Sequence, residues 1–329
     1  MTADPTPVDG KPTRAGGSSL TGSSPGRIAA LGVFDGIHLG HRRILDGALE
    51  WAKSKDLAAI AVTFSTHPDA VVHKQEPKLI VSLPRRVRIL ESMGFDATLL
   101  VPFTEDFARM SPESFAEDFL LNRLGVTGVI VGPNFRFGHR AAGDVERLAE
   151  LGEAHGFGVR VGEELIHPEG VVSSSLIRKR VEAGDVDVAG RLLGRPFHLR
   201  GQVVLGQQRG RSIGFPTVNL APETRLRPGI GVYTSTLERA DGSVHPAVTN
   251  VGVCPTFGAG APLTVETHIL DFDEDLYGEE VAVAFHARLR GEQRFEGPDA
   301  LMAQIARDIA AAREHFRGNP SLTEPLGNL

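Results

Sequence analysis

Several features are absent from the chain, and each absence excludes a kind of structure or binding surface. It has one cysteine, Cys254, which excludes an internal disulfide and a metal site built from several thiolates, and which fits a reducing compartment. No apolar run is long enough to cross a bilayer. Charge of one sign is not in excess either, since the net charge is only −6, so nothing indicates a nucleic-acid-binding or membrane-binding surface.

A Gly-x4-Gly-Lys-Ser/Thr phosphate loop is also absent, so any ATP chemistry must use another device. What is present is ordinary for a globular protein: 41% of residues are hydrophobic, and 329 residues are enough for two domains. Residues 1–26 are rich in Gly, Ser, Thr and Pro and contain no apolar core of a signal peptide. They are predicted to be a disordered tail, and the protein is predicted to be cytoplasmic.

Apolar strands alternate with helical patterns through the first part of the chain. Nearly continuous apolar runs predict buried strands at 28–31, 57–64, 97–101, 128–131 and 158–161. Between them, patterns with helical spacing predict helices at 42–53, 84–94 and 111–125. This alternation is typical of an α/β fold with a parallel sheet.

The pattern changes after Gly194-Arg195-Pro196, where a short helix that Asp185 is expected to cap comes to an end. Strands then follow in quick succession with polar turns, at 199–205, 231–238, 246–251, 263–271 and 280–290. This spacing predicts a small antiparallel β-barrel, closed by a helix over 298–316 and followed by a loose tail from 320. We therefore predict two folded domains, 27–194 and 195–329.

The sequence Gly32-Val33-Phe34-Asp35-Gly36-Ile37-His38-Leu39-Gly40-His41 joins the first strand to the first helix. Its glycines let the backbone approach a ligand, the helix start offers unpaired N–H groups, and two imidazoles lie where an anion would bind. The pattern predicts a phosphate site. A helix cap with satisfied polar groups would also explain two histidines in such a turn.

Two later segments of the first domain have similar potential. Residues 131–138 follow the fourth strand, at the edge where open α/β sheets bind ligands, although their phenylalanines could be core and their arginine a surface charge. Further on, Ser173, Ser174 and Ser175 precede a helix that contains Arg178. Capping explains one serine, whereas an anion held by hydroxyls, N-terminal amides and a guanidinium explains all four residues.

The second domain contains glycines at a spacing of four, namely Gly206, Gly210 and Gly214, followed by Phe215-Pro216-Thr217-Val218-Asn219. Three glycines and a proline make a helix unfavourable, so a flexible loop beside a rigid turn is expected, and a plain surface hairpin is the alternative. Thr217 and Asn219 point to the same side of an extended segment, and their oxygens suit Mg²⁺.

A later strand pattern places Glu266 and His268 on one face, which a solvated strand surface would also explain.

Together these segments resemble, in order, the motifs of the prokaryotic bifunctional riboflavin kinase/FAD synthetases, from about residue 28 to residue 316. The turn at 32–41 is similar to the His-x-Gly-His signature of the nucleotidyltransferase superfamily. The resemblance implies that riboflavin and ATP give FMN and ADP in the C-terminal barrel. It also implies that FMN and ATP give FAD and pyrophosphate in a Rossmann-like N-terminal domain, with Mg²⁺ as the metal.

The resemblance also assigns roles to residues. In the first domain it implies catalytic roles for His38, His41 and Arg178. It implies nucleotide contacts for Gly32, Phe34, Asp35, Gly36, Asn134, Ser174 and Ser175. It implies flavin contacts for His67, Arg136 and Phe137. In the second domain it implies that Glu266 is the base, that Gly206, Gly210 and Gly214 cover ATP, and that Thr217 and Asn219 hold Mg²⁺.

Some positions depart from the family pattern. Ser65 and Thr66 stand where the family usually has aspartate and proline, although His67 is retained, and Ser175 replaces a threonine while keeping the hydroxyl. These departures leave two alternatives open. The first domain could have lost adenylyl transfer, leaving a riboflavin kinase, or the protein could be a non-catalytic flavin-binding regulator.

Overall fold

The structure is a computed structural model that describes residues 13–15, 26–206, 210, 213–253 and 263–325. The described residues form two compact units. The first contains everything up to Pro77 together with Val81–Val172, and the second contains Lys78–Ile80 and the chain from Ser173 onward. Cys254 and most of the N-terminal tail lie outside the described residues. No helix in the described part of the chain is both long and apolar enough to span a membrane.

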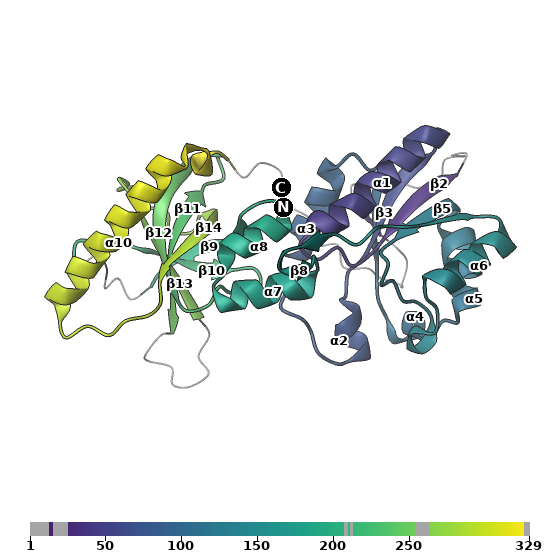
Figure 1. Ribbon diagram of the computed structural model, residues 1–329, viewed down its shortest axis with the longest axis horizontal. Coiled ribbons are helices and arrows are strands. Elements are labelled where there is room, and N and C mark those ends of the chain that lie inside the picture. The colour runs from purple at the N-terminus through teal and green to yellow at the C-terminus, as the bar shows by residue number, and fades with distance from the viewer. Residues whose placement is uncertain (1–12, 16–25, 207–209, 211–212, 254–262, 326–329) are drawn as a thin grey trace. The chain divides into compact units, whose positions relative to one another are not determined.

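The first unit is built on one six-stranded sheet (Figure 1). Neighbouring strands are parallel except at one edge, where β1 runs antiparallel to β4. In spatial order the strands are β1 (Thr13–Ala15), β4 (Ala97–Val101), β3 (Ala58–Phe64), β2 (Arg27–Leu31), β5 (Val126–Val131) and β6 (Gly158–Val161). The predicted parallel α/β sheet is therefore confirmed.

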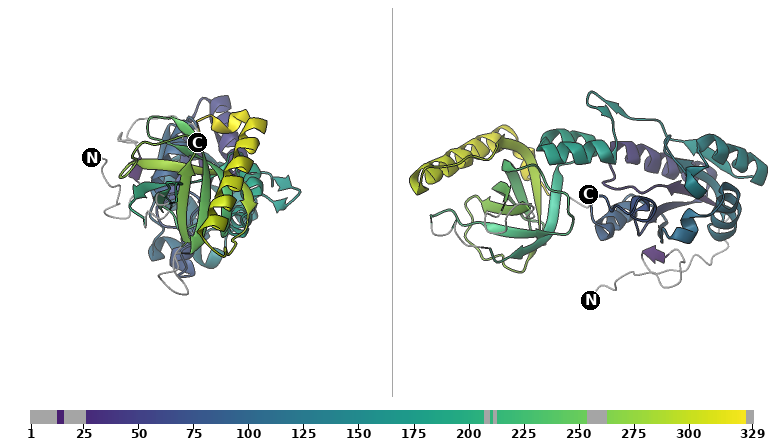
Figure 2. Two further views of the ribbon diagram at one scale, coloured as in Figure 1. Left: turned by 90° about the vertical axis from the view of Figure 1, so that its left-hand side faces the viewer. Right: turned by 90° about the horizontal axis from the view of Figure 1, so that it is seen from below.

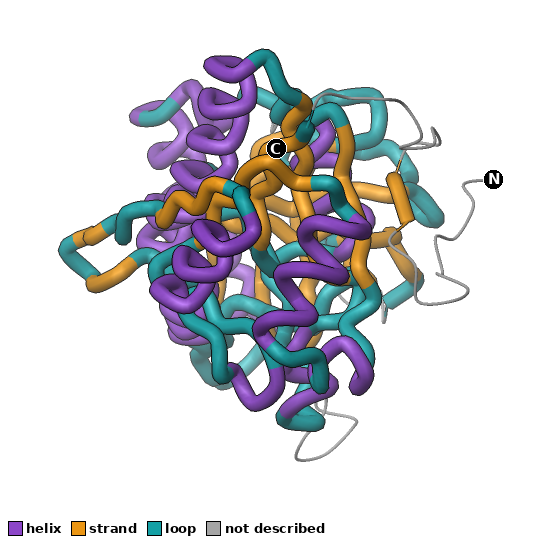
Figure 3. The backbone as a smooth tube through the Cα atoms, turned by 90° about the vertical axis from the view of Figure 1, so that its right-hand side faces the viewer, coloured by secondary structure: helices purple, strands orange, loops and turns teal. Residues whose placement is uncertain are grey.

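Helices cover both faces of this sheet, because its central strands are apolar on both sides. Leu45, Ala48 and Trp51 of α1 (Leu39–Lys55) and Ile89 and Leu90 of α3 (Leu83–Ser92) belong to one core. The core on the opposite face includes residues of η1, a π-helix (Phe115–Arg123), and of α6 (Val145–His155). Figure 3 shows the strands of this unit in orange and the helices in purple.

The order of the strands determines where a ligand can bind. The chain runs from β2 outward to β3 and β4, and then returns to place β5 on the other side of β2. In open α/β sheets the crevice at such a switch point, beyond the carboxyl ends of the strands, is the usual ligand site. The loops that leave β2 and β5 begin at Gly32 and Gly132, which are the two loops with candidate motifs.

The second unit contains a closed antiparallel barrel (Figure 2). Around the barrel the strands are β10 (Val218–Pro222), β13 (Leu263–Ile269), β12 (Val244–Val253), β11 (Gly231–Glu238), β14 (Glu280–Arg290) and β9 (Phe197–Val204). The helix α10 (Pro298–Gly318), yellow in Figure 2, packs along the outside of the barrel. The predicted barrel and closing helix are both present.

Two helices before the barrel also belong to the second unit. They are α7 (Ser174–Ala183) and α8 (Val186–Leu193), and α8 packs against β9 and β14. The backbone N–H of Gly229 donates to Val181 O at 3.0 Å, and Arg288 donates to Ala183 O at 3.3 Å. By compactness the chain divides between Val172 and Ser173, twenty-two residues before the boundary expected from the sequence.

Several details differ from the sequence predictions. The N-terminal segment was expected to be disordered, yet Thr13–Ala15 pair with β4 at the sheet edge. The C-terminal tail was expected to be loose, yet Pro320–Thr323 form a short 3₁₀-helix, and Leu322 packs against the core beside α10. Asp185 precedes α8 without a side-chain cap, because its carboxylate accepts from Arg180 at 3.1 Å. Other short elements are α2 (Pro68–Val72), α4 (Glu105–Ala108), α5 (Pro112–Ser114), η2 (His139–Ala141), β7 (Ile166–His167) and β8 (Gly170–Val171).

Candidate functional site

The turn after β2 has an unusual backbone. Phe34, Gly36 and Ile37 have φ values of 51°, 84° and 41°, and only glycine adopts this left-handed region freely. Phe34 is 1% exposed and Ile37 is fully buried, so tight packing holds both residues in place. Non-glycine residues in this region cost about 1–3 kcal/mol each, and such strain is concentrated at ligand sites.

The turn brings the two histidines of the motif together. His38 is the N-cap of α1, and its Nδ1 accepts a hydrogen bond from the His41 N–H at 3.2 Å. The two rings stack with their centroids 3.6 Å apart, and the edge of Phe34 contacts His41 at 5.4 Å. A Cβ on Gly40 would lie 3.2 Å from His38 Nδ1, which explains the glycine.

The capping interpretation therefore describes His38, but it uses only one ring nitrogen. Because Nδ1 accepts, a neutral His38 carries its proton on Nε2, which is therefore a donor. Burial lowers the pKa of His41 well below its usual value, and the charges of His38 and Arg86 lower it further. The low pKa keeps His41 neutral near pH 7, and a neutral imidazole still has one N–H that can donate to an anion.

A buried arginine lies beneath this turn and was missed by the sequence analysis. Arg86, on α3, is 2% exposed and donates to Val33 O at 2.7 Å. Asp35, also buried, accepts from the Val81 N–H at 3.3 Å. The helical spacing of Arg86 with the buried Ile89 and Leu90 indicates that the arginine is on the buried face of α3.

The loop after β5 has one exposed part and one buried part. The Asn134 amide donates to Glu164 Oε1 at 3.1 Å in an exposed position, and Arg136 pairs with Asp144 at 3.3 Å. Phe137 is 6% exposed and packs against Phe115 with ring centroids 4.9 Å apart. Its ring is thus part of the aromatic core, unlike the open side chains of Asn134 and Arg136.

The remaining first-domain candidates cap or flank helices. His67 is the N-cap of α2, and its Nδ1 accepts from the Asp69 N–H at 3.2 Å. Ser173 caps α7 by accepting from the Leu176 N–H at 3.3 Å, which leaves the hydroxyls of Ser174 and Ser175 in the first turn. Arg178 Nε donates to Lys78 O at 2.9 Å. Ser174, Ser175 and Arg178 belong to the second compact unit, whereas the histidines belong to the first.

On the barrel, three polar residues lie in one row across neighbouring strands. Asn219 of β10 pairs with Glu266 of β13, and Glu266 in turn pairs with Asn250 of β12. Directly paired residues of antiparallel strands place their side chains on the same face. The burial pattern of β13 buries Val265, Thr267 and Ile269, so Glu266 lies on the other face, away from the barrel interior.

The glycine loop closes directly on the Thr217–Asn219 turn. A Cβ on Gly206 would lie 2.0 Å from Asn219 Nδ2, and a Cβ on Gly210 would lie 2.3 Å from Phe215 O and 3.2 Å from Thr217 Oγ1. The carbonyl of Gly210 also accepts from the Phe215 N–H at 2.8 Å. Gly214 instead provides a left-handed turn, with φ 83°. Gly206 and Gly210 are therefore needed for close contact with the two predicted metal ligands, Asn219 and Thr217.

His268 supports the same turn from β13. Its Nδ1 lies 2.8 Å from Pro216 O, which makes Nδ1 the donor, and its ring contacts the edge of Phe215 at 5.9 Å. The sequence placed His268 beside Glu266 without giving it a role. In the structure it holds the Pro216–Thr217 backbone next to that carboxylate.

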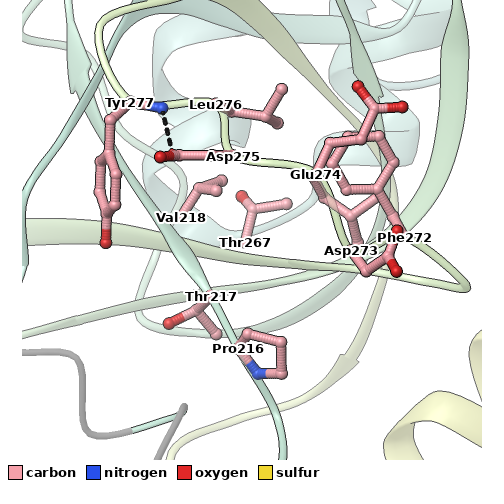
Figure 4. Close-up of a pocket in the computed structure, with 11 residues that line it drawn as sticks. Pro216, Thr217, Val218, Thr267, Phe272, Asp273, Glu274, Asp275, Leu276 and Tyr277 are labelled. Atoms are coloured by element: carbon pink, nitrogen blue, oxygen red, sulfur yellow. Dashed lines mark hydrogen bonds between the residues drawn. The ribbon is translucent and has the colours of Figure 1, made fainter.

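Two cavities meet at Thr217. The first, of about 360 Å³, is bounded by Glu266, His268 and Asn250 on the barrel and by apolar side chains of α10, namely Leu301, Ile305 and Ile309. The second, of about 310 Å³, lies between Pro216–Val218, Thr267 and the loop from Phe272 to Tyr277 (Figure 4). Thr217 lines both cavities, so a group bound near its hydroxyl is within reach of both.

Comparison with known proteins gives a consistent result for both units. Residues 21–176 match the FAD synthetase family, and residues 193–316 match the riboflavin kinase family. The bifunctional riboflavin kinase/FMN adenylyltransferase of Escherichia coli K12 is 35% identical over 301 residues, which cover 91% of this chain and 95% of that protein. The enzyme of the same description from Bacillus subtilis is 34% identical, over 88% of this chain and 92% of that one.

A solved structure shares the arrangement of the chain. It is described as a macrolide-efflux protein from Streptococcus pneumoniae, is 30% identical, and superposes with a TM-score of 0.80 over 89% of this chain and 95% of the other.

Proposed function

The chain belongs to the bifunctional riboflavin kinase/FMN adenylyltransferase family, and from this premise we propose which residues carry each of its two reactions. It is an enzyme that converts riboflavin and ATP to FMN and ADP, and FMN and ATP to FAD and pyrophosphate. Matches to both domains favour the two activities over a kinase alone or a non-catalytic regulator.

The kinase reaction is assigned to the cavity between the barrel and α10. Its apolar wall suits the flat flavin ring, and Glu266 on the opposite side suits the ribityl chain. Glu266 accepts the proton of the terminal hydroxyl as that oxygen attacks the γ-phosphorus of ATP, and the bond from that phosphorus to ADP breaks. The observation that carries this assignment is the direct pairing of Glu266 with Asn219 beside Thr217.

ATP is assigned to the second cavity, with its phosphates at Thr217. Thr217 Oγ1 and the Asn219 amide oxygen are hard donors suited to Mg²⁺, and Gly206 and Gly210 fix the turn that carries them. Within the described residues, no cluster of three or more His, Cys, Asp or Glu side chains could serve as an alternative metal site. When bound, Mg²⁺ would neutralise charge on the phosphates.

Adenylyl transfer is assigned to the switch-point crevice of the first unit. The FMN phosphate attacks the α-phosphorus of ATP and pyrophosphate leaves, so no protein nucleophile is needed. His38 and His41 donate hydrogen bonds to the phosphates. The backbone of Gly32–Gly36 and the Asn134 amide contact the nucleotide, and His67 and Arg136 contact the flavin. Phe137 supports the loop from the core.

The direct test is to incubate the pure protein with riboflavin, ATP and Mg²⁺ and to resolve the flavins by chromatography. The wild type should form FAD. Glu266→Gln keeps the shape of the side chain but removes the proton acceptor, so it should form no FMN from riboflavin and still convert supplied FMN to FAD. Near-normal riboflavin phosphorylation by this variant would mean that the base is another residue.

His41→Ala tests the other site. Loss of a phosphate-facing donor should cost about 3 kcal/mol in the transition state, so FMN should accumulate while FAD formation falls about a hundredfold. His73→Ala, which changes an exposed histidine of the same unit, is the control. FAD formation at the wild-type rate by His41→Ala would refute the assignment. We expect both reactions to take place in the cytoplasm, where ATP is available.

A further inference from the structure

The guanidinium of Arg86 is buried beneath the histidine turn and contacts the start of that turn and the end of β3. Its Nη1 donates to Val33 O at 2.7 Å, to Thr63 Oγ1 at 3.3 Å and to Phe64 O at 3.4 Å. Thr63 Oγ1 also donates to Val33 O at 2.8 Å, so this carbonyl accepts two hydrogen bonds. Val33 immediately precedes Phe34, where the left-handed part of the turn begins.

Placing a charge here is costly. Arg86 is 2% exposed and Thr63 is fully buried, and burial lowers the pKa of the arginine although nearby Asp35 opposes that shift. The Nε of Arg86 is also buried, without a hydrogen-bond partner among the described residues. An apolar side chain would avoid this cost, and a buried charge that is retained commonly fixes one specific arrangement of its surroundings.

The strained turn is the structure that Arg86 can fix. Phe34 and Ile37 have positive φ values, and the strain persists only while surrounding contacts hold it. Arg86 joins Val33, the residue before the turn, to the end of β3, and Asp35 within the turn is held by the Val81 N–H at 3.3 Å. We propose that Arg86 is a positioning residue for adenylyl transfer, which holds the turn that aligns His38 and His41 and presents a fixed positive charge to that pair.

The charge has a consequence that a purely structural contact would not have. Burial is the largest cause of the low pKa of His41, and the two charged groups that lower it further are its stacked neighbour His38, on the same turn, and Arg86, on α3. Asp35 is the counter-charge of Arg86. Removing the arginine charge should raise the pKa of His41 toward its usual value. The acid limb of FAD synthesis should then move to higher pH.

The test uses Arg86→Lys and Arg86→Met in the full chain, with Arg88→Lys and Arg88→Met as controls. Arg88 is on the same helix but exposed. A lysine keeps the charge, but its shorter stem and compact ammonium do not place a donor where the planar guanidinium places Nη1, so Arg86→Lys should lower kcat for FAD synthesis about tenfold with an unchanged pH profile. Arg86→Met should lower kcat further and shift the acid limb. Riboflavin phosphorylation in the second unit should be unchanged in every variant.

The inference rests on the proposed adenylyl-transfer site, and the outcomes separate the two. If His41→Ala abolishes FAD synthesis while both Arg86 variants match the wild type, only the positioning role is wrong. If Arg88 variants lose as much FAD synthesis as Arg86 variants, the effect is not specific to the buried guanidinium and the inference is overturned. Should Arg86→Met fail to fold, the kcat and pH profile of Arg86→Lys decide the question.

Discussion

His286 shows how one buried residue makes stability depend on pH. It is 9% exposed on β14, its Nε2 lies 3.0 Å from Thr236 Oγ1, and its ring contacts Phe316 of α10. Burial, with a smaller contribution from His315, lowers its pKa from 6.5 to about 4. The folded barrel therefore keeps this imidazole neutral at pH values where the unfolded chain would protonate it.

We predict that the second unit loses stability between pH 6.5 and 4. In that interval the unfolded state binds one more proton at His286 than the folded state, so the contribution of His286 to the free energy of unfolding falls as the pH falls, by roughly 3 kcal/mol, and this contribution levels off below pH 4. Both tyrosines, Tyr233 and Tyr277, are in this unit, so their near-ultraviolet circular dichroism can follow its urea unfolding. His286→Gln should make the dependence shallower. An equally steep dependence in the variant would contradict this account.

At the scale of elements, Gly206 and Gly210 pack directly against the segment that leads into β10 and against β10 itself. Gly210 approaches Thr217 because it has no side chain, and Gly206 approaches Asn219 for the same reason. His268 of β13 holds the intervening backbone at Pro216. The geometry of the predicted metal ligands thus depends on three separate segments that meet at one turn.

Gly210→Ala should therefore impair the kinase without unfolding the barrel. Its Cβ would come within 2.3 Å of Phe215 O, and relief of this clash must displace the turn that carries Thr217. We expect kcat/KM for riboflavin phosphorylation to fall at least about tenfold, with FAD synthesis from supplied FMN unchanged. Gly318→Ala is the matched control, because a Cβ there meets nothing within 4 Å. A Gly210→Ala enzyme with normal kinase kinetics would show that the turn tolerates displacement.

Elements with a strong local pattern were predictable from the sequence. The parallel strands are short apolar runs, and α7 begins after Ser173 and ends at Gly184 as expected. By contrast, β10 has a mixed burial pattern and exists because it pairs with the preceding strand β9 and with β13, which is distant in sequence. The π-helical hydrogen bonding of Phe115–Arg123 likewise leaves no spacing that differs visibly from an α-helix.

In the candidate sites, the residues that belong to motifs could be found from the sequence, and a buried residue outside the motifs could not. Motifs located the histidine turn, the glycine loop and Glu266, because each combines unusual residues at fixed spacing. Arg86 was missed because an arginine in a helix normally indicates solvent exposure. Phe137, which the resemblance assigns to the flavin, packs against Phe115 in the core, and an aromatic residue within a motif has the same sequence pattern whether it binds a ligand or packs in the core, so its flavin contact stays a prediction.

At the scale of the whole molecule, the second unit begins with the helices α7 and α8 and not with the barrel. Their buried side chains, among them Ile177, Val181 and Leu192, are fully inaccessible to solvent, and α8 packs against β9 and β14 of the barrel. The Tyr233 hydroxyl donates to Gly229 O, and the neighbouring Gly229 N–H donates to Val181 O of α7. A fragment that begins at Arg195 lacks both helices and exposes the barrel surface that they cover.

The two possible starting points can be compared directly. We predict that the fragment 173–329 folds cooperatively and phosphorylates riboflavin without making FAD, because Thr217, Asn219, Glu266 and both cavities lie within it. The fragment lacks Lys78–Ile80 and so loses the Lys78–Glu182 ion pair and the hydrogen bond from Arg178 to Lys78 O, but both are exposed and contribute about 1 kcal/mol or less each. The fragment 195–329 should unfold at a lower temperature, because burial of an apolar side chain contributes about 1.5–3 kcal/mol. Equal melting temperatures for the two fragments, followed by tyrosine circular dichroism, would mean that α7 and α8 do not stabilise the barrel. A folded 173–329 fragment without kinase activity would mean that the first unit completes the kinase site.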